Sequence, residues 1–261
     1  MAGHSKWANI KRQKARVDAV RGKTFTQLSR AIIVAARNGV PDPQGNFQLR
    51  TAIEKAKAAG IPNDNIERAI AKGAGTFEED SANFEFIRYE GYGPEGVAIL
   101  IEALTDNRNR TAADLRAAFS KNGGNLGETG CVSWMFAQKG VVRFLTYERY
   151  TNIPFEEEEV LELCLEVDAD SYELTEVDAE KAVELFTDVG NLETLSQTLK
   201  EKGYAVEAEI RWIPNNTVEV SDCDRARSLL KLIDTLESLD DVQNVTANFD
   251  MADQLMALSV V

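Results

Sequence analysis

Residue types that support catalysis are scarce in this sequence of 261 residues. It has one histidine, His4, and three cysteines, Cys131, Cys164 and Cys223, which lie far apart and lack the close spacing of metal ligands. A Ser-His or Cys-His catalytic pair therefore cannot be assembled away from residue 4. We expect a protein that is not an enzyme and has no cofactor or bound metal. Its cysteines are expected to be reduced, as in cytoplasmic proteins.

Long apolar runs are also missing. No stretch of 18 apolar residues is present, and no apolar segment follows the charges at the N-terminus. The sequence therefore predicts neither a membrane span nor a secretory signal, and we expect a cytoplasmic protein that does not bind membranes. The apolar fraction of 44% is ordinary for a globular protein, and the length predicts two or three domains.

Positive charge is scarce over most of the chain but concentrated at its start. Residues 1–76 contain 14 Lys and Arg against five Asp and Glu, a net charge of +9. Residues 77–261 contain 15 against 38, a net charge of −23, and the whole chain carries −14. This asymmetry indicates that the basic part binds nucleic acid or another polyanion. The acidic remainder would repel a polyanion and restrict contact to one end.

The first 23 residues contain seven Lys and Arg against one acid, Asp18. If residues 8–20 are helical, these cations form a surface that suits phosphates. Trp7 either stacks on an unpaired base or anchors the segment, and His4 either contacts phosphate or is structural. A solvated tail and an Arg-rich transit peptide are the alternatives for the whole segment. The residues predicted here to bind nucleic acid are His4, Lys6, Trp7, Lys11, Arg12, Lys14, Arg16, Arg21 and Lys23.

A second polar segment, Thr105–Thr111 (TDNRNRT), lies between a predicted strand and a predicted helix. Asn and Arg at a helix entrance suit phosphates or base edges. Helix capping together with surface salt bridges is an equally good interpretation. Thr111 and Asp114 have the spacing of a capping box at the start of the helix. A further polar stretch, Lys121–Asn125 (KNGGN), follows the helix. The nucleic-acid-binding residues predicted in these two segments are Asn107, Arg108, Asn109, Arg110 and Lys121.

Hydrophobic periodicity predicts an α+β fold. It consists of an N-terminal helical domain and two α/β (ferredoxin-like) domains, the third inserted into the second. Predicted helices cover residues 24–38, 48–59, 64–72, 156–167 and 192–202, with others that include 111–119 and 226–233. Predicted strands cover 84–90, 97–105, 131–136, 141–145, 171–177, 183–189, 204–213 and 242–249. The corresponding domains are 1–76, 82–138 with 215–250, and 139–214.

The segment Gly91–Gly96 matches the GxGxxG string of dinucleotide-binding proteins. That fingerprint requires a helix directly after its last glycine, because the helix N-terminus binds the pyrophosphate. Here a strand-like run, Val97–Ile101, follows instead. We interpret the glycines as a hairpin turn and predict no nucleotide site.

Several segments resemble the YebC/PmpR family. They are Met1–Asn9, Arg21–Lys23, Tyr89–Pro94, Thr105–Thr111, Phe119–Gly127 and Leu239–Gln243. The resemblance runs nearly end to end and is weakest over residues 146–212. It implies one helical and two α/β domains, the third inserted into the second, and a cytoplasmic, non-enzymatic role. The family is described as transcriptional regulators, with mitochondrial relatives that activate translation.

Three functions are consistent with these features. The first is a DNA-binding transcriptional regulator, as the resemblance implies. The second is a translation factor that binds ribosomal RNA and associates with the ribosome. It is favoured by the absence of an evident helix-turn-helix with base-reading side chains, and by a cationic segment with one aromatic residue. The third is a protein-interaction module whose acidic domains bind a partner. No dimerisation pattern is evident, so we expect a monomer.

Overall fold

The computed structural model describes residues 18–75, 84–145, 157–177 and 180–258. Its contacts divide the chain into two compact units. One unit is Phe136–Asn215, and the other contains the described residues before and after it. The domain boundaries given above remain a proposal, which limited proteolysis would test. No helix in the described ranges is long and apolar enough to cross a membrane.

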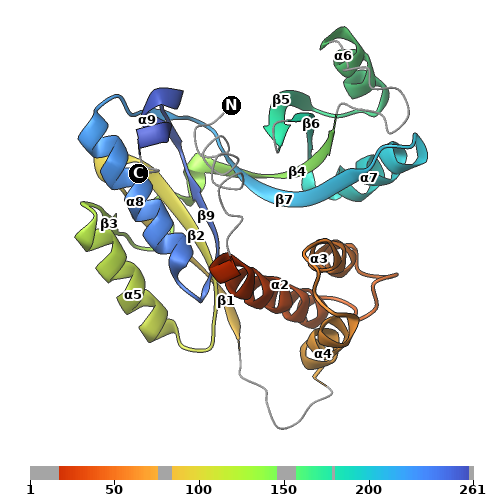
Figure 1. Cartoon of the computed structure of the whole chain (residues 1–261), viewed down its shortest axis with the longest axis horizontal. Coiled ribbons are helices and arrows are strands. Elements are labelled where there is room, and N and C mark those ends of the chain that lie inside the picture. The colour runs from red at the N-terminus through yellow and green to blue at the C-terminus, as the bar shows by residue number, and fades with distance from the viewer. Residues whose placement is uncertain (1–17, 76–83, 146–156, 178–179, 259–261) are drawn as a thin grey trace. The chain divides into compact units, whose positions relative to one another are not determined.

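Three helices form the N-terminal helical module: α2 (Asp18–Asn38), α3 (Phe47–Ala58) and α4 (Asn63–Gly73) (Figure 1). Helix α2 starts earlier than predicted, because its first residues are too polar to contribute to an apolar stripe. Asn46 caps α3 by accepting a hydrogen bond from the Leu49 amide, and it also donates to the Ala35 carbonyl at the end of α2. Gly73 lets α4 approach α2 closely, because a Cβ there would lie 2.5 Å from the Ile33 carbonyl oxygen.

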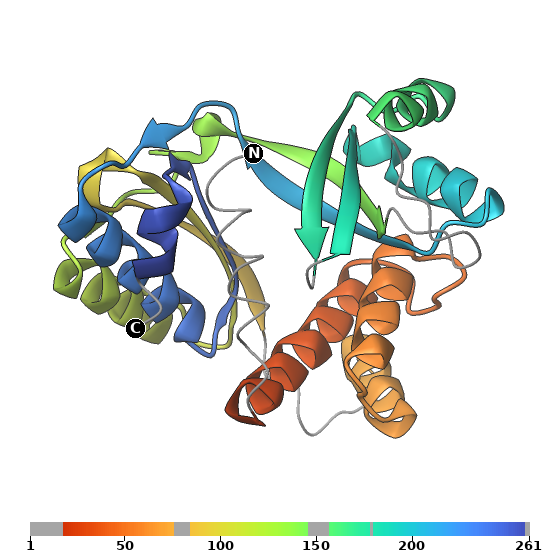
Figure 2. The same cartoon turned by 45° about the horizontal axis from the view of Figure 1, so that its top comes forward.

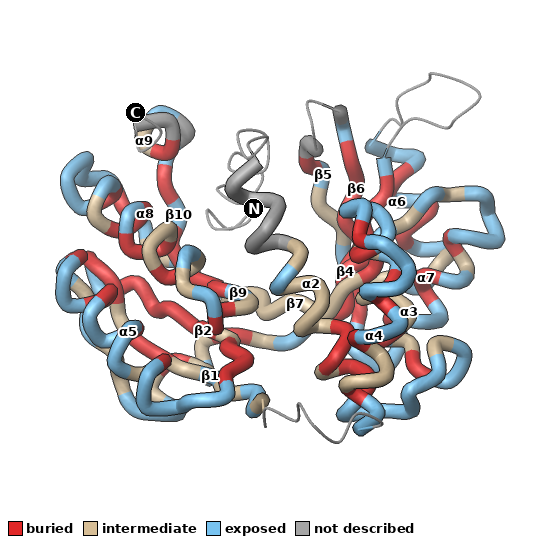
Figure 3. The backbone as a smooth tube through the Cα atoms, turned by 60° about the horizontal axis from the view of Figure 1, so that its bottom comes forward, coloured by how far each residue is buried: buried red, intermediate tan, exposed pale blue. Residues whose placement is uncertain are grey.

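A four-stranded antiparallel sheet follows, with the order β3-β1-β2-β9. Its strands are β1 (Glu85–Tyr92), β2 (Ala98–Thr105), β3 (Asn125–Leu126) and β9 (Val242–Ala247). Strand β2 is buried along almost its whole length (Figure 3). Helices α5 (Arg108–Lys121) and α8 (Cys223–Ser238) contact each other beside the sheet (Figures 1 and 2). Smaller elements of this unit are β8 (Val218–Glu219), β10 (Phe249–Asp250) and α9 (Asp253–Leu258).

The glycines of the GxGxxG string lie at the end of β1 and in the connection between β1 and β2. Gly91 is the penultimate residue of β1, and the Gly93 amide donates to the Val97 carbonyl at 2.8 Å. A single 3-10 turn, η1 (Pro94–Gly96), separates the two strands. The predicted hairpin turn is therefore confirmed. No helix begins at Gly96 to bind a pyrophosphate.

The unit Phe136–Asn215 has the predicted β-α-β-β-α-β sequence. Its elements are β4 (Phe136–Leu145), α6 (Glu157–Glu166), β5 (Ser171–Val177), β6 (Glu180–Thr187), a 3-10 turn η3 (Val189–Asn191), α7 (Leu192–Glu201) and β7 (Val206–Pro214). The antiparallel order β5-β6-β4-β7 is that of the split βαβ fold. Before and after this unit the chain contributes β2 and β9, which pair with each other. The predicted insertion of one α/β unit into another is thus confirmed.

The strand predicted over 131–136 is wrong. These residues form a loop and the 3-10 turn η2 (Ser133–Met135), and strand β4 begins only at Phe136. The backbone amides of Gly130, Val132 and Ser133 donate to the side chain of Glu90 rather than to a neighbouring strand. A carboxylate distant in sequence therefore accepts the hydrogen bonds of amides that would pair with a neighbouring strand if this segment were a strand.

Candidate nucleic-acid interface

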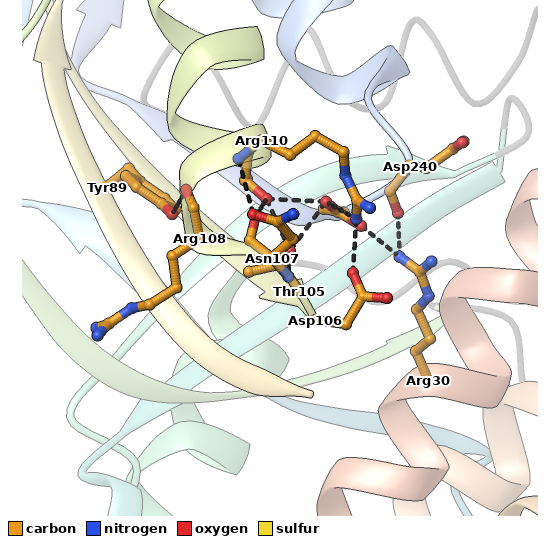
Figure 4. A network of polar contacts seen from close by, with 10 residues as sticks. Arg30, Tyr89, Thr105, Asp106, Asn107, Arg108, Arg110 and Asp240 are labelled. Carbon is orange, nitrogen blue, oxygen red and sulfur yellow. Dashed lines mark hydrogen bonds and ion pairs between the residues drawn. The ribbon is translucent and has the colours of Figure 1, made fainter. Parts of the chain in front are cut away.

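The segment Thr105–Thr111 is organised around Asp241, which lies just before β9. Figure 4 shows Thr105, Asn107 and Arg110 of this segment within a network of polar contacts. The Asp241 Oδ2 atom accepts hydrogen bonds from the hydroxyls of Thr105 and Thr111, at 3.0 and 2.8 Å. It also accepts one from Arg110 Nη2 at 2.9 Å. Burial acts to raise the pKa of Asp241, but these donors outweigh burial and the pKa is lowered. The ionised carboxylate thus joins the end of β2, the start of α5 and the start of β9.

Asn107 caps helix α5, with its Oδ1 atom accepting from the Arg110 amide at 3.1 Å. The helix therefore starts at Arg108, and the predicted capping box at Thr111 is wrong. Thr111 lies inside the helix, where its hydroxyl binds Asp241 rather than a free helical amide. Asn has a stronger N-cap preference than Thr, and the contact of Thr111 with Asp241 adds a tertiary reason for the helix to start before Thr111.

The two arginines of this segment are both paired with carboxylates. Arg110 contacts Asp241 and, at 2.7 Å, Asp106, and these two carboxylates raise its pKa. Arg108 lies 3.2 Å from Glu85 and keeps an exposed side chain. Asn109 is exposed on the first turn of α5. Capping and salt bridges account for Asn107 and Arg110, and contact with nucleic acid stays a prediction for all four residues.

A cavity of about 570 Å³ adjoins this network. Helix α2 contributes to it, because Arg30 donates to the Asp240 carbonyl and lies 3.4 Å from Asp241 Oδ1. The lining contains four carboxylates but only two guanidinium groups. Both guanidinium groups are already paired with carboxylates of the lining. Such a lining repels a phosphate. The residues that line it are Arg30, Asp106, Arg110, Thr111, Asp114, Ser238, Leu239, Asp240 and Asp241.

At the opposite end of α5, Lys121 lines a second cleft, of about 380 Å³. Among the described residues neither Lys121 nor Lys231 makes an ion pair, and Arg225 is 3.4 Å from the exposed Glu95. The one carboxylate in the lining, Asp224, is paired with Arg227 at 3.2 Å. We call this the basic cleft, and it is lined by Pro94, Lys121, Asn122, Gly123, Asp224, Arg225, Ser228 and Lys231.

Sequence reasoning predicted Lys121 but missed Arg225 and Lys231. Arg225, Ser228 and Lys231 have the i, i+3, i+6 spacing of one helical face, and this is the signal that the sequence offered. That spacing alone is typical of any solvated helix. Only the packing of α5 against α8 brings Lys121 to this face.

Most of the predicted basic N-terminal residues lie outside the described part of the chain. These are His4, Lys6, Trp7, Lys11, Arg12, Lys14 and Arg16. Arg21 and Lys23 lie in helix α2. Their binding of nucleic acid stays a prediction.

A helical module joined to two α/β units, one inserted into the other, defines an architectural class. Two family models match within it: the TACO1/YebC protein N-terminal domain over residues 5–76, and the TACO1/YebC second and third domain over residues 84–249. The chain belongs to the TACO1/YebC family. The resemblance to YebC found in the sequence is thereby confirmed.

Curated relatives are similar to this chain over its full length. A protein of Gloeothece citriformis and one of Nostoc punctiforme are each 74% identical over 100% of both chains, and each is named "probable transcriptional regulatory protein". The crystal structure of a conserved hypothetical protein from Aquifex aeolicus is 46% identical. It superposes with a TM-score of 0.80 over 92% of this chain and 94% of that one. The relatives are thus named as regulators rather than enzymes.

Proposed function

We propose that this protein is a non-enzymatic regulator of gene expression that binds the phosphate backbone of nucleic acid. The names of its relatives support a regulatory role. The net charge of +9 over residues 1–76 supports contact with a polyanion. The basic cleft carries the proposal, because it gathers three cations on a unit that is otherwise acidic.

Unpaired lysines suit phosphate better than the arginines of the Thr105–Thr111 segment do. A phosphate that binds Arg110 has to compete with two carboxylates within 2.9 Å. Lys121 and Lys231 have no such competitor in the described part of the chain. Each phosphate contact also releases a counterion, so binding should weaken steeply with salt. The basic cleft is therefore the better phosphate site of the two.

RNA is favoured over duplex DNA by the helical module. Helices α3 and α4 are joined by four residues that include Gly60 with φ +82°, a connection as short as that of a helix-turn-helix. The exposed start of α4 nevertheless carries Asp64 and Glu67 ahead of its first cation, Arg68. Carboxylates at this position would face the phosphates of a major groove and be repelled. A translation factor that binds ribosomal RNA is therefore the second candidate, beside a transcriptional regulator that binds DNA.

The test compares binding of the full chain to labelled structured RNA, single-stranded RNA and duplex DNA, at about 50 and 200 mM salt. Replacing both cleft lysines, Lys121→Gln with Lys231→Gln, should weaken binding and reduce the salt slope by about two, roughly one per phosphate contact. The matched control removes two exposed cations elsewhere, Arg116→Gln with Lys57→Gln.

A wild-type chain that binds none of these nucleic acids at low salt would contradict the proposal. The acidic domains would then be better explained as a protein-interaction module. Equal losses of affinity in the cleft variant and the control would mean that binding depends on net charge and not on the cleft. Tight binding to RNA but not duplex DNA would select the translation factor. The reverse would select the transcriptional regulator.

A further inference from the structure

Helix α6 of the inserted unit leaves part of its apolar surface open to solvent. Its buried residues are Val160, Leu163 and Cys164. Leu161 and Leu165 are instead 47% and 73% exposed. Together these five apolar positions span an arc of roughly 200° around the helix axis, whereas a helix packed on one side needs about 100°. The two leucines therefore extend the apolar surface beyond what the fold of this unit buries.

The exposed leucines form one row on the flank of α6 that borders the sheet edge. Glu157, Leu161 and Leu165 are spaced four residues apart and so lie in one row. The Tyr172 hydroxyl on the edge strand β5 donates to Glu157 Oε1 at 3.4 Å, which places the start of this row beside β5. Leu174 follows Tyr172 by two residues, so it is on the same face of the sheet, and it is 47% exposed. A partner on this flank thus meets exposed leucines on both elements.

The leucine row is accompanied by acids. Helix α6 contains five glutamates and no Lys or Arg. Glu158 and Glu162 are exposed, and neither makes an ion pair in the part of the chain that the structure describes. Together with Leu161 and Leu165 they occupy a sector of roughly 100° around the helix. We call these four residues the α6 face. It combines an apolar strip with two unpaired carboxylates.

The charge of the α6 face limits what can bind it. The inserted unit Phe136–Asn215 has seven Lys and Arg against 19 Asp and Glu, a net charge of −12. Nucleic acid and anionic lipid headgroups would both be repelled by this surface. A two-fold contact between the α6 helices of two copies would place identical glutamates opposite each other. A protein segment that carries cations around an apolar strip has none of these costs.

We propose that the α6 face binds a basic amphipathic helix of a partner protein. Leucines one helical turn apart match the i, i+3, i+4, i+7 stripe of such a helix. Lys or Arg beside that stripe would pair with Glu158 and Glu162, as charged residues flank the apolar seam of a coiled coil. An apolar centre with a polar rim is also the usual composition of a protein interface. This inference goes beyond the proposed function and does not depend on it, because the basic cleft belongs to the other unit.

The test uses a labelled helical peptide of leucine and lysine, with leucine at the i, i+3, i+4 and i+7 positions, and the full chain. A peptide of the same composition in scrambled order measures binding by charge alone. Leu165→Gln should weaken binding of the amphipathic peptide about tenfold, because an interface leucine is lost. Val40→Gln is the matched control, since Val40 is 57% exposed in the other unit, and it should bind like the wild type.

A second pair of variants tests the acids. Glu158→Gln with Glu162→Gln should weaken binding several-fold at low salt and make the affinity less dependent on salt, because two charge contacts are lost. Glu128→Gln with Glu219→Gln removes the same charge from two exposed positions of the other unit. This control should keep the affinity and the salt dependence close to those of the wild type.

Failure of the wild type to bind the amphipathic peptide, or equal binding of the scrambled peptide, would overturn the inference. Wild-type affinity in Leu165→Gln would overturn it too. Self-association of the full chain that Leu165→Gln abolishes in sedimentation would assign the α6 face to a second copy instead. A gain in peptide affinity in Lys11→Gln with Lys14→Gln would assign it to the chain's own basic N-terminal segment.

The outcome is separable from that of the proposed function. Leu165→Gln should bind nucleic acid like the wild type, because the substitution leaves the basic cleft and the net charge unchanged. Loss of nucleic-acid binding in this variant would contradict the independence of the two surfaces. The unfolding midpoint of each variant should equal that of the wild type, since the replaced side chains are exposed.

Discussion

Arg110 and Asp241 are 131 residues apart in the sequence, and their side chains lie 2.9 Å apart in the fold. Between them in the chain lies the whole inserted unit Phe136–Asn215. The contact joins the first turn of α5 to the residue that precedes β9. Asp241 therefore helps to position β9, which follows the inserted unit, beside β2, which precedes it. Thr105, Arg110 and Thr111 of this segment thus have a structural role, because all three bind Asp241.

We expect Asp241→Asn to destabilise the protein. The amide keeps the shape of the side chain but removes the charge that strengthens three hydrogen bonds, from Thr105, Thr111 and Arg110. The expected loss in the free energy of unfolding is about 2 kcal/mol, measured by urea denaturation. Asp114→Asn, an exposed residue of the same cavity, should change it by less than about 0.5 kcal/mol. Similar losses in the two variants would contradict the structural role of Asp241.

Acid should destabilise the protein through Asp241 and Glu90. Both have a pKa lowered from the ordinary values of 3.8 and 4.5, so each contributes stability that is complete above these values. That contribution is lost as the pH falls through the folded pKa, where the folded state takes up the proton. Urea midpoints measured from pH 7 down to about pH 3 should fall steeply below about pH 4.5. The fall should be shallower in Asp241→Asn, and an unchanged slope would argue against a lowered pKa.

The loop Gly130–Ser133 should lose its order when Glu90 is replaced. Glu90→Ala removes the acceptor of three amides, of which that of Val132 is buried and those of Gly130 and Ser133 are partly buried. Hydrogen exchange should then accelerate at Gly130, Val132 and Ser133, while amides of β2 stay protected. Glu128→Ala, an exposed acid in the same loop, is the control. Slow exchange at the three amides in Glu90→Ala would show that the loop is held by other contacts.

The sequence predicted the parts of the fold that follow from local periodicity. The order of strands and helices in Phe136–Asn215 and the insertion were predicted because each element carries its own apolar pattern. The strand at Cys131 and the capping box at Thr111 were wrong for one shared reason. In both places a distant carboxylate, Glu90 or Asp241, binds the local donors, and no local pattern reveals such a partner.

The candidate site shows the same limit. Lys121 was predicted because it stands in a polar segment. That it lines the same cleft as Lys231 could not be predicted, because this depends on the packing of α5 against α8. The two lysines are far apart in sequence, and each is ordinary in its own helix. The pairing of Arg108 and Arg110 with carboxylates was left open between two interpretations. Only the packed structure reveals which cations have a carboxylate beside them.

In the inserted unit, a buried charge cluster on the sheet is expected to control stability. Glu184 on β6 accepts from Arg143 Nε on β4 at 2.8 Å and from Arg211 Nη1 on β7 at 2.8 Å. Burial acts to raise the pKa of Glu184, but the two guanidinium groups outweigh it and the pKa is lowered. Glu184 thus contacts one cation on each of the two strands that follow β6 in the sheet order, and Arg211 also pairs with Glu209 at 2.8 Å.

Glu184→Gln leaves the guanidinium groups of Arg143 and Arg211 buried beside each other without the charge between them. Removing one member of a buried ion pair costs about 3–5 kcal/mol, and we expect a loss in the free energy of unfolding within that range. Glu207→Gln is the control, because Glu207 also pairs with Arg143 but at 3.7 Å, with a side chain 73% exposed. It should cost less than about 1 kcal/mol. A loss for Glu184→Gln no larger than that of Glu207→Gln would mean that water or another anion neutralises the two arginines.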